Sequence, residues 1–235
     1  MRSPFRKLIA AFALLLGCAT ALAQGAPAPQ NVLQLSASGS IEVQQDLLTL
    51  RLTTTREGAE PNLVQNQLKA ALDTALSEAR KSAVAGEMDV RTGNFSLAPR
   101  YSREGRITGW SGTAELVLEG RDFPRITSTA ARIQTMTMGG VFFGLSREQR
   151  ARVEMDAQAL AIERFKAKAS ELAKGFGFAG YTLREVSVNS NEQGMVRPMR
   201  AMAMEMKSAQ VDAPLPVEAG RSTVVVNISG SVQLR

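Results

Sequence analysis

The feature that most constrains the fold is a helical pattern that runs from Ser146 to Phe176. Eight uncharged residues follow one another at intervals of three or four, the spacing that places side chains on one face of an α-helix: Ala151, Met155, Ala159, Ile162, Phe165, Ala169, Leu172 and Phe176. The hydroxyl of Ser146, three residues before Gln149, has the spacing of an N-terminal cap. So long a helix needs another layer of structure to cover its apolar face.

The charged residues of this segment predict a solvated, salt-bridged helix face rather than a site of acid–base catalysis. Three pairs of opposite charge are separated by four residues, the spacing at which neighbouring side chains on a helix meet: Glu148 with Arg152, Arg150 with Glu154, and Arg152 with Asp156. Lys168 and Ser170 lie inside the same pattern, so we do not interpret them as a catalytic dyad.

Two further helices are predicted by caps and apolar spacing. Pro61 stands at a first-turn position, where its missing N–H costs nothing, and Gly86 is a plausible end. The apolar face of this helix is Val64, Leu68, Ala71, Leu72, Ala75 and Ala79. Asp122 can cap a shorter helix that contains Pro124 in its first turn and ends near residue 134.

The remaining segments alternate between apolar and polar residues and predict strands. They are residues 32–35 with 41–43, then 47–55, about 88–101, 106–119, 140–145, 181–190 and 222–234. We expect the first two strands to form a hairpin that turns near Ser38–Gly39 or near residues 44–46. A polar turn at 102–105 joins the next two, Gly139–Gly140 is interpreted as another turn, and Trp110 as a residue of the core or sheet face.

Helices interleaved with strands indicate an α+β fold, in which helices pack on mixed or antiparallel sheet. Element order in residues 121–235 echoes that in residues 32–120, so we expect two similar lobes of strands and helices with that boundary. Residues 24–31 are interpreted as a linker, and residues 191–220 as a loop rich in methionine and proline.

The start of the chain has the parts of an export signal. Residues 1–23 hold a basic leader, an apolar stretch at 8–17 too short to cross a bilayer, and a small-residue cleavage site after Ala23. Cleavage there predicts a periplasmic protein. The alternative is acylation of Cys18, which ends a lipobox-like stretch and would anchor the protein to a membrane.

The residue types that are missing exclude several functions. The chain has no histidine and a single cysteine, Cys18, which the predicted cleavage removes. Catalytic triads with histidine, thiolate nucleophiles and zinc–thiolate sites are therefore excluded, and a hydrolase that uses carboxylates alone is the remaining enzymatic alternative.

Cleavage also leaves 25 lysines and arginines against 22 acidic residues, a net charge of +3 instead of +6. No dense basic patch with aromatic residues remains, so we predict no nucleic-acid partner.

One segment has an unusual composition. Five methionines fall within twelve residues: Met195, Met199, Met202, Met204 and Met206. Their thioethers suit Cu(I), and exposed thioethers are also reversible targets of oxidants. The third interpretation is an adaptable apolar loop that packs on a neighbouring subunit or is disordered. We assign no cofactor.

Several stretches resemble the SIMPL-domain family. They are residues 36–43 followed by Asp46, the dipeptide Gly109–Trp110, and residues 141–146 leading into the alanine-rich helix. The resemblance extends over residues 32–235, with order and spacing kept.

The resemblance implies a periplasmic or envelope protein of a largely uncharacterised family. Some members are linked to defence against oxidative stress, and some form ring-like or channel-like homo-oligomers. It supplies no catalytic residue. We therefore expect an exported, non-enzymatic, self-assembling protein with a role in oxidative or envelope stress tolerance. Membrane contact is expected only through lipidation or assembly.

Overall fold

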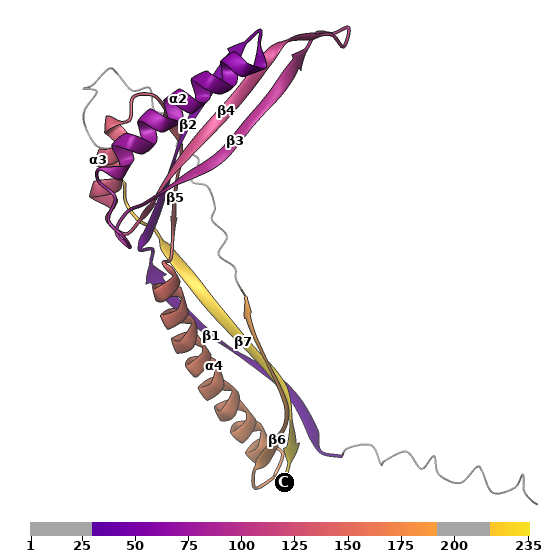
Figure 1. Ribbon diagram of the computed structural model, residues 1–235. Helices are drawn as coiled ribbons and strands as arrows, with labels where there is room; N and C mark the ends of the chain where they lie inside the picture. Colours follow the sequence, from indigo (N-terminus) through magenta and orange to yellow (C-terminus); the bar gives the residue numbers. More distant parts are fainter. Residues whose placement is uncertain (1–29, 192–216) are drawn as a thin grey trace, which may run out of the picture.

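The computed structural model describes residues 30–191 and 217–235. The predicted export signal, with Cys18 and Ala23, lies outside these residues, and so do the five clustered methionines. The described chain forms two antiparallel sheets, so the predicted α+β fold is confirmed. Figure 1 shows an elongated molecule with one sheet at each end.

The four-stranded lobe contains four strands in the order β3-β4-β2-β5 and two helices. Its elements are β2 (Leu47–Gly58), α2 (Pro61–Arg80), β3 (Asp89–Tyr101), β4 (Ile107–Gly120), α3 (Phe123–Arg132) and β5 (Thr137–Gly144). The three-stranded lobe has the order β1-β7-β6 and one helix. Its elements are β1 (Val32–Gln44), α4 (Arg147–Gly175), β6 (Tyr181–Asn191) and β7 (Arg221–Leu234).

The predicted hairpin between the first two strands is wrong. β1 pairs along its whole length with β7, whereas β2 pairs with β4 and β5 in the other sheet. Neither predicted turn is present: Gln45 and Asp46 connect β1 to β2 in the other sheet without a turn, and β1 continues without interruption through Gly39. Alternation predicts which face of a strand is buried, but it does not identify the strand that pairs with it.

The sheets also divide the chain differently from the expected boundary at residue 120. β1 belongs to the sheet of the last two strands, and α3 with β5 belongs to the first sheet. Gly139–Gly140 is not a turn, because both residues lie in β5. Arg51 is paired with Gly140 and Leu52 with Met138, which leaves Gly139 as the extra residue of a β-bulge.

The core of the four-stranded lobe confirms the predicted face of α2. The six residues predicted to face inward are the six that the structure buries in that helix. They pack on strands β2 and β4, where Leu48, Leu50, Leu116 and Leu118 are fully buried. Trp110 lies at the end of this core beside Val64 and Leu68, as a packing residue.

The buried face of α4 differs from the predicted one. The helix and the Ser146 cap are confirmed, since the Ser146 hydroxyl accepts from the backbone N–H of Gln149. The buried side chains recur strictly every four residues: Val153, Ala157, Ala161, Phe165, Ala169 and Ala173. Of the eight residues predicted to face inward, only Phe165 and Ala169 are buried, and Met155 and Phe176 are exposed. The prediction followed the spacing of uncharged residues, whereas four of the six buried positions are alanines, because the helix and the sheet lie very close together.

Candidate functional site

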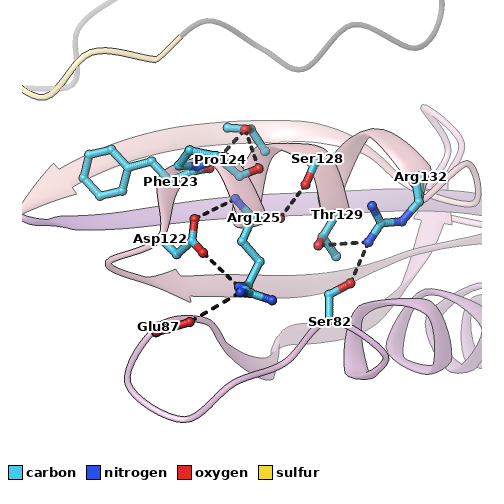
Figure 2. A network of polar contacts seen from close by, with 10 residues as sticks. Ser82, Glu87, Asp122, Phe123, Pro124, Arg125, Ser128, Thr129 and Arg132 are labelled. Carbon is cyan, nitrogen blue, oxygen red and sulfur yellow. Dashed lines mark hydrogen bonds and ion pairs between the residues drawn. The ribbon is translucent and has the colours of Figure 1, made fainter.

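A large hollow in the described structure lies beside α3. It has a volume of about 760 Å³ and combines hydroxyl groups, two arginines and a small apolar wall. Its lining residues are Ser82, Asp122, Phe123, Pro124, Arg125, Thr127, Ser128, Thr129, Arg132 and Val217. Figure 2 shows most of them on α3 and on the loop that follows α2.

The local sequence explains why α3 forms and how Arg125 is placed. Asp122 caps the helix, because its Oδ1 accepts from the backbone N–H of Arg125 at 3.0 Å. The other carboxylate oxygen accepts from the Nε of Arg125 at 2.9 Å. The same guanidinium also approaches Glu87, at 3.4 Å, so it ties the start of α3 to the loop before β3 (Figure 2).

Arg132 makes the equivalent connection at the other end of α3. Its Nη2 donates to the hydroxyl of Ser82 at 2.6 Å, and its Nε to Glu78 at 3.1 Å. Hydrogen bonds from Lys81 and then from Arg132 lower the pKa of Glu78 below its ordinary value of 4.5. Both ends of this ten-residue helix are therefore held to α2 and its following loop by charge-assisted hydrogen bonds.

The hollow has the chemistry of a structural polar network rather than that of a catalytic centre. Each guanidinium faces at least one carboxylate, so the pairs neutralise the positive charge. No described hydroxyl in the hollow has a histidine or lysine as a hydrogen-bond partner that could activate it. Within residues 30–191 and 217–235, no group of three histidine, cysteine or acidic residues could hold a metal ion.

A second polar site joins the two lobes. The carboxylate of Asp46 accepts from the backbone N–H of Ser146 at 2.7 Å and from its hydroxyl at 2.6 Å. Gln45 donates to the hydroxyl of Ser222 at 2.9 Å and, at 3.5 Å, to the carbonyl of Phe143. These bonds connect the three places where the described part of the chain passes between the lobes, so the site fixes the junction.

An apolar strip on β6 is the third candidate. Leu183, Val186 and Val188 are 50%, 46% and 47% exposed. Their pairing partners on β7 include the buried Val232 and Ile228, so the strip lies on the sheet face that carries α4. The helix packs mainly over β1 and β7 and leaves most of β6 uncovered (Figure 1).

The functional candidates predicted from the sequence are dispersed. The three charge pairs of α4 form no ion pair in the structure, which contradicts the predicted salt-bridged face. The Nζ of Lys168 donates to the backbone carbonyl of Ser36 at 3.1 Å, away from any dyad with Ser170. The five methionines fall outside the described residues, although Val217, which follows that segment, lines the hollow beside α3.

The α3 network was missed, although part of its signal was in the sequence. Asp122 and Arg125 are three residues apart, and Arg132 follows Arg125 by seven, so both arginines lie on one face of the predicted helix. Their partners Ser82 and Glu87 come from an irregular loop, and no periodicity places such residues.

The family model for SIMPL, described as a protein of unknown function (DUF541), matches residues 33–232. No curated protein matches the chain. None of the described helices is long and apolar enough to cross a membrane.

Proposed function

Because the chain belongs to the SIMPL family, whose function is unknown, we propose that it is an exported, non-enzymatic envelope protein that assembles with copies of itself. The apolar strip on β6 carries this proposal. Three large aliphatic side chains in one row remain about half exposed, and contiguous exposed apolar surface marks sites of association.

The free edge of β6 supports the same interface. Among the described residues β6 pairs only with β7, on one side, and an unpaired edge is a template for another strand. From Val186 to Ser190 the strand carries no charge that would discourage such pairing. The edge strand β1 differs, because Arg164 and Lys168 donate to its carbonyls at Ser38 and Ser36.

Lysine substitution in the strip tests the interface. Light scattering on residues 24–235 is expected to show a discrete oligomer for the unchanged protein. Val186→Lys with Val188→Lys should shift it toward the monomer, because assembly would bury two unpaired charges. Gln158→Lys with Ala167→Lys adds the same charge to exposed positions of α4 and should leave the oligomer intact.

Two results would count against the proposal. If the protein is strictly monomeric at micromolar concentration, self-assembly is contradicted altogether. An oligomer that survives both lysine substitutions shows that β6 is not the interface.

Export and stress tolerance are the other parts of the proposed function. They are supported by the predicted signal at residues 1–23 and by the family resemblance. Mass spectrometry of the purified protein tests export, with Gln24 expected as the first residue and an acylated Cys18 as the contrary result. A deletion strain challenged with an oxidant tests the stress role. The unchanged gene should restore survival and the gene with the β6 lysines should not, whereas equal survival without the protein would contradict the role.

A further inference from the structure

The outer end of the four-stranded lobe carries an exposed apolar pair among arginines. β3 and β4 continue as a two-stranded ribbon beyond Gly58, the last residue of β2 that pairs with β4. At the end of the ribbon Tyr101 is paired with Ile107, and these side chains are 62% and 55% exposed. Figure 1 shows this hairpin projecting past the start of α2, at the opposite end of the molecule from the C-terminus.

The turn between the two strands is well defined. The Ser102 hydroxyl accepts from the backbone N–H groups of Glu104 and Arg106, at 3.2 and 3.3 Å. Gly105 adopts a φ of +77°, a conformation that glycine reaches without the steric cost of a side chain. The apolar pair is therefore presented on a fixed turn and not on a frayed end.

The charge of this tip is basic. Residues 100–107 contain three arginines and one glutamate. Arg103 forms no ion pair within the described chain, and Arg106 approaches Glu104 only at 3.8 Å, with both side chains largely exposed. Guanidinium groups bind phosphate in a bidentate manner, and tyrosine is favoured at the boundary between water and lipid.

We propose that the β3–β4 tip, residues 100–107, binds the surface of a membrane that contains anionic phospholipid. Tyr101 and Ile107 would enter the headgroup region, and Arg103 and Arg106 would pair with lipid phosphates. A symmetric contact between the tips of two copies is disfavoured, because two basic tips repel each other. This contact would be separate from lipidation and from assembly through β6.

Vesicle sedimentation of residues 24–235 tests the proposal. Vesicles of phosphatidylcholine with phosphatidylglycerol should bind the unchanged protein, and vesicles of phosphatidylcholine alone should bind it far less. Arg103→Glu with Arg106→Glu should weaken binding at least about tenfold, since each basic group near an anionic surface contributes about 1 kcal/mol and reversal adds repulsion. Tyr101→Ser with Ile107→Ser should also weaken it, while keeping the charge.

A matched control separates the tip from net charge. Arg152→Glu with Lys166→Glu makes the same charge change at exposed positions of α4 and should bind almost as the unchanged protein does. Circular dichroism confirms that every variant is folded. The proposal is overturned if the unchanged protein does not bind anionic vesicles or if both tip variants bind as well as the unchanged protein. It is also overturned if the α4 variant loses as much binding as the tip variants.

Discussion

Replacing Gly39 by alanine tests the close packing of α4 on β1. A Cβ at this position would overlap the carbonyl oxygen of Ala157 and lie 2.8 Å from the backbone nitrogen of Ala161. Ordinary contacts of a Cβ begin near 3.4 Å, so the helix must retreat by more than half an ångström at Ala161 and by more at Ala157. A gap of about 0.5–1 Å already removes a quarter to a half of a contact's dispersion energy.

The expected loss of stability follows from that displacement. Overpacking of a core typically costs about 1–3 kcal/mol. We expect the upper end for Gly39→Ala, because the clash is with helix backbone, which no change of rotamer relieves. For a chain of this size, about 3 kcal/mol lowers the Tm by roughly 6–12 °C.

Thermal unfolding followed by circular dichroism measures the effect, with Gly144→Ala as the matched control. No heavy atom lies within 4 Å of a Cβ at Gly144, and its φ is not positive, so alanine there should leave the Tm unchanged or slightly raised. Adding Ala157→Gly to Gly39→Ala should give no rescue, since the overlap is with the carbonyl oxygen. The reasoning is refuted if the free energy of unfolding of the Gly39→Ala protein lies within about 0.5 kcal/mol of that of the unchanged protein.

Three further substitutions have expected outcomes. Ser146→Ala removes both the cap of α4 and a hydrogen bond to Asp46. The free energy of unfolding in urea should therefore fall by about 1–3 kcal/mol. A smaller decrease would contradict the role of the hydroxyl in both hydrogen bonds. Gly105→Ala places a side chain at a positive φ and should lower the free energy of unfolding by about 1 kcal/mol. The control Gly144→Ala should leave that free energy unchanged. Glu78→Gln removes a carboxylate whose pKa is lowered on folding, so the stabilisation is complete above the ordinary pKa of 4.5 and disappears as the pH falls through the folded pKa below it. Its deficit in urea unfolding should therefore be larger at neutral pH than in acid, and a deficit independent of pH would contradict the linkage.

Local signals predicted most elements but not how they assemble. The caps at Asp122 and Ser146 and the inward face of α2 depend on contacts within a few residues, and each is confirmed. The pairing of Val32 with Gln233 joins the two ends of the described chain. No local pattern contains that information, so the hairpin between the first two strands was the simpler and incorrect prediction.

The error in α4 has a different physical origin. The predicted face was chosen by the spacing of uncharged residues, whereas Ala157 and Ala161 are buried because Gly39 lets the helix backbone reach the strand. The larger side chains of Met155 and Phe176 are then turned outward, where they are exposed. A glycine within an alternating strand was the available signal for this close approach.

The same close approach explains why β6 is left open. The helix lies directly above Gly39 on β1, one outer strand of the three-stranded sheet. A helix is about 10 Å wide and neighbouring strands are about 4.8 Å apart, so one helix placed there covers β1 and β7 but not β6. The exposed row that includes Val186 and Val188 therefore follows from the position of α4, and the strip proposed for self-assembly has the same structural cause as the contact tested by Gly39→Ala.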